Sequence, residues 1–181
     1  EAEQTYIDTV KDTFGASLVA YWPLNEASGT VAYDVSGNGL HGAYTGVDLG
    51  QTGIGDGETA PYFDGANDFV NVYSAGLAGA FNGAAGTLMV WGNSVVGNDG
   101  NNKIAAYLAA SFSNRVDIRK TTSGIVQMYY AAGGVTKTAN VGALTPGAYA
   151  QYVLTWDKVA DQTILYLNGT QSGATLTVLG T

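Results

Sequence analysis

A glycine-rich turn near the start of the chain carries residue types that could hold a hard cation. Asp34 precedes the run SGNG at residues 36–39, and His41 follows it. Calcium takes about six to eight oxygen ligands, and a glycine-rich turn can direct several backbone carbonyls towards one point. A calcium site made by the Asp34 carboxylate and the carbonyls of Gly39 and His41 is one hypothesis for this turn. The alternative is an Asx-type turn, in which Asp34 accepts hydrogen bonds from nearby amides without a metal.

A second group of polar and aromatic residues alternates with apolar ones in the middle of the chain. Arg115, Asp117 and Arg119 share one face of a predicted strand, and Gln127 and Tyr129 share one face of the next. Paired as a hairpin, the two strands form a polar and aromatic stripe. Arginine, aspartate and glutamine hydrogen-bond sugar hydroxyls while a tyrosine ring stacks on a pyranose, so the stripe is the candidate glycan-binding site. The alternative is a solvated face with cross-strand ion pairs.

Histidine and carboxylate patterns argue against catalysis. His41 is the only histidine, which leaves little material for a histidine dyad or a histidine-based zinc site. Glycoside hydrolysis needs two closely placed carboxylates, and neither Glu26 nor the other glutamates form such a pair. Asp64, Asn67 and Asp68 could face a second cation or a sugar, but a local turn is the favoured interpretation. We therefore expect no catalytic residues and no enzyme activity.

Three stretches resemble the laminin-G-like, concanavalin A-like domains. Residues 20–46, AYWPLNEASGTVAYDVSGNGLHGAYTG, are similar to a YW-x-L-x-E strand followed by a D-x-SGNG-x-HG turn. PYFDGANDFVNV at residues 61–72 is similar to the family's FDG-x-x-D-x-V strand, and LTWDKVADQTILYLNG at residues 154–169 is similar to its penultimate hairpin. The resemblance implies an all-β jelly-roll sandwich of two antiparallel sheets, and it favours calcium near Asp34.

Family members usually continue past this hairpin with further strands, one of which carries an acidic residue that often completes the calcium shell. The sequence ends at Thr181 without them. We therefore expect a fragment, with a partner that supplies the closing strands as the alternative, because a sandwich lacking them would expose unpaired edges.

The composition limits the classes of function. The chain of 181 residues has 26 glycines, 12 tyrosines and no cysteine, which favours short strands and tight turns and excludes a disulfide scaffold. Its formal charge is −8, from 15 acidic and 7 basic residues. No Lys/Arg cluster could release counterions from a phosphate backbone, so no nucleic-acid partner is expected. No apolar run has membrane-spanning length, so no membrane insertion is expected.

One helix and a series of strands must position these residues. Apolar side chains recur at a helical spacing at Tyr6, Ile7, Val10 and Phe14, which predicts an N-terminal helical segment over residues 1–17. The laminin-G-like sandwich then occupies residues 18–181. Strands are expected at 18–22, 42–45, 60–63, 69–72, 87–91, 104–111, 115–120, 124–130, 150–157 and 163–168, with a strand-like stretch at 174–179.

Two further expectations concern tryptophans and turns. Trp22, Trp91 and Trp156 each lie within an apolar strand, so all three are expected in the core. Asn168-Gly169-Thr170 matches a glycosylation sequon, but Asn-Gly is also a preferred hairpin turn, and a turn is the favoured interpretation. Residues 76–86 are expected to form an ordered loop.

These observations favour one domain that is extracellular or lies on a virion or cell surface. Its expected function is that of a non-catalytic, calcium-stabilised binding module that recognises a glycan or a surface polymer. The alternative is a structural protein that decorates or assembles a phage capsid, a surface layer or an extracellular filament through an exposed sheet edge. Glycoside hydrolysis is the third class, disfavoured by the missing carboxylate pair.

Overall fold

The apolar spacing at the N-terminus produces a helix. In the computed structural model, which describes residues 2–93, 99–111, 113–143 and 145–179, α1 spans Ala2–Phe14. Ile7 and Val10, three residues apart on one face, are buried. A short 3-10 turn, η1 (Gly15–Ser17), follows directly and starts at Gly15, whose φ of +50° suits glycine. Within the described residues, no helix is long and apolar enough to cross a membrane.

The chain forms two compact units, Glu1–Phe81 and Asn82–Thr181. After α1, the first unit consists of small antiparallel sheets. One contains β1 (Val31–Ala32), β2 (Gly42–Thr45) and β5 (Phe69–Asn71) in the order β1-β2-β5, and the other pairs β3 (Asp48–Thr52) with β4 (Thr59–Tyr62). Instead of the expected loop at residues 76–86, a helix, α2 (Ala75–Ala80), follows β5. It begins where the Ser74 hydroxyl accepts a hydrogen bond from the Leu77 amide.

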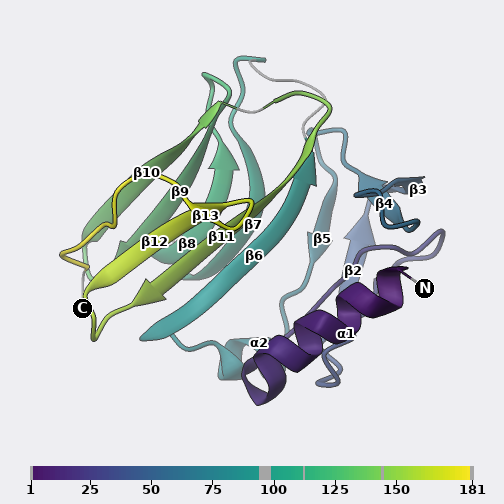
Figure 1. Cartoon of the computed structure of the whole chain (residues 1–181), viewed down its shortest axis with the longest axis horizontal. Helices are drawn as coiled ribbons and strands as arrows, with labels where there is room; N and C mark the ends of the chain where they lie inside the picture. Colours follow the sequence, from purple (N-terminus) through teal and green to yellow (C-terminus); the bar gives the residue numbers. More distant parts are fainter. Residues whose placement is uncertain (1, 94–98, 112, 144, 180–181) are drawn as a thin grey trace. The chain divides into compact units, whose positions relative to one another are not determined.

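Two four-stranded antiparallel sheets form the second unit. The first, the β7–β10 sheet, contains β7 (Lys103–Ser111), β8 (Asn114–Lys120), β9 (Ile125–Ala132) and β10 (Val135–Ala143) in sequential order. The second, the β6–β13 sheet, has the order β13-β12-β11-β6 and contains β6 (Ala85–Asn93), β11 (Tyr149–Asp157), β12 (Gln162–Leu167) and β13 (Thr170–Gln171). Figure 1 shows these two sheets as separate layers.

Both sheets of the second unit contribute to one hydrophobic core. Its buried members come from alternate positions of four strands: Val116, Ile118, Val126, Met128, Tyr130, Tyr152, Leu154, Trp156 and Leu165. Side chains alternate between the two faces of a strand, so burial of residues 116 and 118 places residues 115, 117 and 119 on the opposite face. The core therefore sets the orientation of the candidate binding residues.

The predicted β character is confirmed: the chain is mostly β, with several antiparallel sheets and a short N-terminal helix. Nine of the ten expected strands are present, with ends shifted by at most two residues. The strand expected at residues 18–22 is wrong, because this segment forms no sheet pairing and is bonded instead to the turn after Asp34. β1, β3, β10 and β13 were not predicted. The single-domain organisation, with a boundary at residues 17 and 18, stays a prediction.

The strand-like stretch at residues 174–179 makes one isolated bridge. Leu176 and Thr163 exchange two backbone hydrogen bonds of 2.9 Å, so this stretch lies along β12. Asp161 holds its end, because the Asp161 carboxylate accepts hydrogen bonds from the amides of Val178 and Leu179 at 2.9 and 2.8 Å. The sheet edge beside residues 174–179 is thus paired by the chain itself at Leu176.

The three tryptophans differ in how far they are buried. Trp156 is buried in the core, as predicted. The core prediction is wrong for Trp91, which is 36% exposed because its register partner is Gln151, on the face of β11 that points away from the core. Trp22 is half-buried outside the core cluster, and its indole Nε1 donates to the Leu40 carbonyl at 2.8 Å.

Candidate functional site

Three rows of side chains cross the outer face of the β7–β10 sheet, and we name this surface the arginine–tyrosine face. The first row contains the register partners Ile104, Arg119, Gln127 and Asn140. The second contains Tyr107, Asp117, Tyr129 and Thr138. The third contains Ala109, Arg115, Ala131 and Thr136. Neighbouring strands lie about 4.8 Å apart, so each row is roughly 14 Å long.

Asp117 lies at the centre of this face and is completely buried. Tyr107 and Tyr129 flank it on the two neighbouring strands, while Arg115 and Arg119 lie on either side of it along β8. Arg119 donates two hydrogen bonds to the Asp117 carboxylate, from Nε and Nη2, and Nε of Arg115 lies 3.3 Å from Asp117 Oδ2. A buried carboxylate needs such partners, because an unpaired charge is strongly disfavoured away from water.

Tyr129 holds both guanidinium groups from the neighbouring strand. Its ring centroid lies 4.2 Å from Cζ of Arg115 and 4.5 Å from Cζ of Arg119, which is cation–π geometry. The Tyr129 hydroxyl lies 3.4 Å from the hydroxyl of Thr136 on β10. The two arginines, Asp117 and Tyr129 therefore constrain one another before any ligand arrives.

The first row extends this arrangement with amide groups. Gln127 Nε2 donates to Asn140 Oδ1 at 3.0 Å. Within the described residues, this bond leaves Gln127 Oε1 and Asn140 Nδ2 without a further protein partner. One acceptor and one donor thus remain beside Arg119, which is suitable for the hydroxyl groups of a sugar.

The five residues predicted to form the stripe lie together on this face: Arg115, Asp117, Arg119, Gln127 and Tyr129. The sequence interpretation missed Tyr107, which is 43% exposed, and Asn140. Tyr107 lies on β7, which the predicted two-strand stripe does not include. Asn140 lies on β10. The sequence pattern that predicts this strand is Gly133-Gly134, which forms a two-residue hairpin turn between Ala132 and Val135.

The Asp34 carboxylate organises the glycine-rich turn through four hydrogen bonds. Oδ1 accepts from the amides of Tyr21 and Ser36, both at 2.9 Å. Oδ2 accepts from the Ser36 hydroxyl at 2.8 Å and from the Leu40 amide at 2.9 Å. Burial alone raises the pKa of Asp34, but these hydrogen bonds outweigh it, and the pKa lies below its ordinary value.

The surroundings of Asp34 do not fit a calcium shell. Protein donors engage both carboxylate oxygens, and His41 Nδ1 accepts the Asp34 amide hydrogen at 3.0 Å. Gly39 has a φ of +69° and serves the turn. Across the described ranges, no group of three or more His, Asp and Glu side chains could hold a metal ion. The arrangement fits the Asx-type turn, and calcium stays a prediction.

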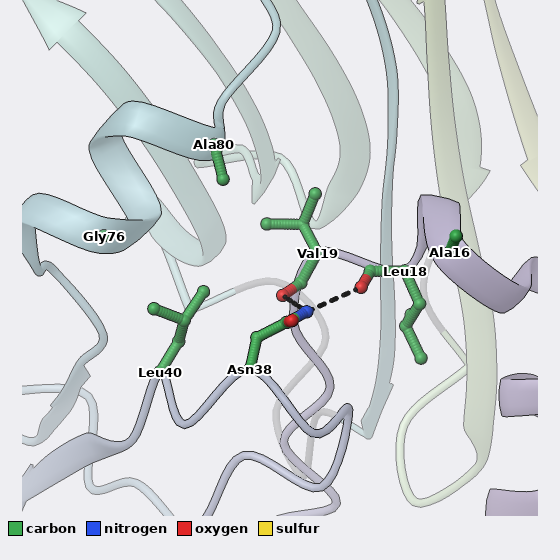
Figure 2. Close-up of a pocket in the computed structure, with 7 residues that line it drawn as sticks. All are labelled: Ala16, Leu18, Val19, Asn38, Leu40, Gly76 and Ala80. Carbon is green, nitrogen blue, oxygen red and sulfur yellow. Dashed lines mark hydrogen bonds between the residues drawn. The ribbon is translucent and has the colours of Figure 1, made fainter.

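The same turn borders a pocket of about 350 Å³ in the first unit. Figure 2 shows its lining residues: Ala16, Leu18, Val19, Asn38, Leu40, Gly76 and Ala80. Asn38 Nδ2 donates to the carbonyls of Leu18 and Val19, both at 3.0 Å, as the dashed lines in Figure 2 show. The lining is mostly aliphatic and carries no ionisable side chain, so the pocket offers little for specific chemistry.

Two further candidate sites from the sequence, the Asp64–Asp68 cluster and the Asn168-Gly169-Thr170 sequon, form local turns. The Asp64 amide donates to Asp68 Oδ2 at 2.8 Å, and the Ala66 amide donates to Asp64 Oδ1 at 2.7 Å, which confirms the local turn. Asn168 and Gly169, with φ of 49° and 78°, form the two-residue turn between β12 and β13. The turn interpretation of Asn168-Gly169 is confirmed.

Comparisons with known proteins give one distant neighbour. No family model and no curated protein matches the chain. Residues 221–444 of an S-layer domain-containing protein from Clostridium thermocellum ATCC 27405 have a crystal structure that is similar, with a TM-score of 0.48 and 21% sequence identity. The match covers 90% of this chain and 73% of that one. Similarity at this level carries no information about what this chain binds.

Proposed function

We propose that this protein is a non-catalytic binding module that recognises a glycan through the arginine–tyrosine face. The observation that carries the proposal is the register, which places a row with two tyrosines beside a row with a guanidinium and two amides. An aromatic ring stacks on the apolar face of a pyranose, and planar donors and acceptors beside it bind the hydroxyl groups. Tyr107 provides the exposed ring, and Gln127 and Asn140 provide the amides.

Preorganisation supports the same proposal. Asp117 and Tyr129 hold the side chains of Arg115 and Arg119 in place. Side chains that are already ordered lose less conformational entropy when a ligand binds. The ion-pair network therefore acts as the support of the binding surface, and the exposed groups on either side of it make the contacts.

The proposal includes the laminin-G-like jelly-roll sandwich that the sequence motifs resemble. The shared core of the two sheets in the second unit supports a two-layer arrangement. We also propose a location outside the cell or on a virion or cell surface, where glycans are accessible. No role for calcium is included, because the Asp34 carboxylate is engaged by protein donors.

A polysaccharide panel tests the proposal, with binding measured by affinity electrophoresis and then by calorimetry. The variant is Tyr107→Ala, and the matched control is Tyr73→Ala, which removes an aromatic ring that is 77% exposed in the first unit. We expect Tyr107→Ala to weaken binding about tenfold and the control to bind like the wild type. Equal affinities for wild type and Tyr107→Ala, or no retained polysaccharide, would contradict the proposal.

A different observation favours a second candidate function, assembly with neighbouring chains. In the described part of the second unit, β6 is an edge strand of its sheet. It pairs with β11 over its whole length without a register break and contains no charged residue and no proline. β7 and β10, the edges of the other sheet, each contain a lysine and a register break. Proteins usually protect edge strands with such features, and β6 lacks them.

We infer that strand addition at β6 would join copies of the chain in a surface layer, a filament or a capsid decoration. Light scattering after size-exclusion chromatography tests this candidate over a range of concentrations. Thr87→Lys places a charge on β6 and should shift oligomers towards monomers, whereas Gln51→Lys makes the same charge change on exposed β3 and should not. A wild type that stays monomeric at every concentration contradicts assembly.

A further inference from the structure

We propose that the glycan bound at the arginine–tyrosine face carries a carboxylate, and that Arg119 recognises this group. The inference rests on the proposed glycan-binding function and adds the chemical class of the ligand. The face carries a local positive charge. Among the residues of its three rows, the ionic side chains are Arg115, Arg119 and Asp117, which together leave one excess positive charge.

This local excess contrasts with the chain as a whole. The formal charge of the protein is −8, with 15 acidic residues. The only carboxylate in the three rows, that of Asp117, is buried and bound by both arginines. Lys120 and Lys137 add nothing to this face, because their register partners on β9 are the core residues Val126 and Tyr130. An anionic ligand thus finds electrostatic complementarity on this face of an acidic protein.

Exposure distinguishes the two arginines. The Arg115 side chain is 7% exposed, and the Arg119 side chain is 20% exposed. Within the described residues, Asp117 is the carboxylate that engages Arg119, through Nε and Nη2, which leaves the Nη1 amino group for a ligand. A guanidinium group is planar and presents its donors as a fork that matches a carboxylate.

The rest of the first row determines how the sugar would lie. Gln127 is the direct register partner of Arg119, and Asn140 is the partner of Gln127 on the next strand. A carboxylate at Arg119 therefore places sugar hydroxyls over the Gln127–Asn140 amide pair, with the Tyr129 and Tyr107 rings in the adjacent row. One excess positive charge matches the single negative charge of a uronic acid, whereas a phosphate monoester carries about 1.5 to 2 negative charges at pH 7.

The experiment compares paired ligands by isothermal titration calorimetry on the whole chain. Oligomers of galacturonic acid, mannuronic acid and glucuronic acid are each titrated as the free acid and as the methyl ester, which keeps the sugar and removes the charge. A sulfated oligosaccharide and an oligosaccharide phosphate are included as other anions. We expect at least one free acid to bind tenfold or more tightly than its ester, and its affinity to fall as salt rises.

Variants assign the preference to Arg119. Arg119→Gln should bind the acid and the ester with equal affinity, and Arg119→Lys should keep part of the preference for the acid. Lys11→Gln, which makes the same charge change on exposed α1, should keep all of it. Thermal unfolding of each variant shows whether it folds. If Arg119→Gln does not fold, the acid and ester titrations of the wild-type protein still decide whether the ligand is a carboxylate.

Each outcome separates this inference from the proposed function. Equal binding of acid and ester overturns the carboxylate inference and leaves glycan binding intact. Preferred binding of the sulfated or phosphorylated sugar overturns it in favour of another anion. Binding to none of these sugars, nor to any neutral polysaccharide of the panel, overturns both.

Discussion

Trp156 and Gly86 are register partners on β11 and β6, and the indole ring of Trp156 occupies the space that a side chain at residue 86 would need. A Cβ atom built on Gly86 would lie 2.3 Å from Cζ2 of Trp156. Trp156 belongs to the buried core, and its Nε1 donates to the Asn82 carbonyl at 3.3 Å. The missing side chain at Gly86 is therefore part of the core packing.

Gly86→Ala should destabilise the protein because the added methyl group collides with the Trp156 indole. We expect the free energy of unfolding to fall by about 1–3 kcal/mol, measured by urea denaturation. Gly92→Ala is the matched control on the same strand, because a Cβ atom there meets Tyr152 Cε2 at an ordinary 3.8 Å. An equal effect of the two substitutions would show that the packing against Trp156 is not the cause.

Asp34→Asn should loosen the glycine-rich turn. The asparagine amide group presents N–H donors where the carboxylate accepts hydrogen bonds from Ser36 and Leu40. We therefore expect the free energy of unfolding to fall by about 2 kcal/mol. Asp48→Asn, at an exposed position of β3, should change the free energy of unfolding by less than about 0.5 kcal/mol. Denaturant titrations of both variants at neutral pH provide the measurement.

The Asp34 turn also predicts a pH dependence. Its pKa in the folded protein is lowered, so its stabilising contribution is fully present above the unfolded value of about 3.9. The contribution is lost as the pH falls from there through the folded pKa. The difference in unfolding free energy between wild type and Asp34→Asn should therefore shrink at acid pH. A difference that stays constant down to about pH 2 contradicts this role of the carboxylate.

Asp117→Ala should lower the free energy of unfolding more than Gly86→Ala or Asp34→Asn. The substitution leaves Arg115 and Arg119 next to each other without the buried carboxylate that both contact. We therefore expect the free energy of unfolding to fall by about 3–5 kcal/mol. The double variant Asp117→Ala with Arg119→Gln removes one of the two facing charges and should recover part of this loss. If Asp117→Ala unfolds like the wild type, the ion-pair network does not support the face.

Asp161 should control the mobility of the end of the described chain. Its carboxylate accepts the amide hydrogens of Val178 and Leu179, and these bonds lower the pKa of Asp161. Val178 has a φ of +61°, an uncommon conformation for a β-branched residue. Asp161→Ala should raise hydrogen exchange at both amides more than tenfold, and Asp161→Asn should raise it less. The Leu176 amide, bonded to the Thr163 carbonyl, is the internal control and should keep its protection.

Strands were predictable where apolar and polar residues alternate and the apolar ones are buried in the core. In β8, residues 116 and 118 are apolar and 115, 117 and 119 are polar, so the sequence alone predicts both the strand and the face that points away from the core. The segment at residues 18–22 is equally apolar, yet it forms no strand. Its backbone bonds to the side chains of Asp34 and Asn38 and to the Val35 amide, and a local pattern cannot show such pairing at a distance.

The candidate site was predictable only in part. Alternation placed Arg119 and Gln127 on one face, and the register makes them direct partners. Tyr107 was missed because alternation within one strand does not show that β7 pairs with β8. The sequence also left two interpretations of Asp34 open. The fold shows hydrogen bonds to its oxygens, as an Asx-type turn requires, and two of the residues that donate them, Tyr21 and Leu40, are not identifiable from spacing.

The most direct test of the central claim is an NMR titration with a polysaccharide-derived oligosaccharide that the panel shows to bind, using protein labelled at the tyrosine rings. Glycan binding at the arginine–tyrosine face predicts concentration-dependent shifts for Tyr107 and Tyr129, and none for Tyr166 on β12 of the other sheet. Shifts confined to Tyr166, or to tyrosines of the first unit, while Tyr107 and Tyr129 stay unchanged, would contradict the assignment of this face as the binding site.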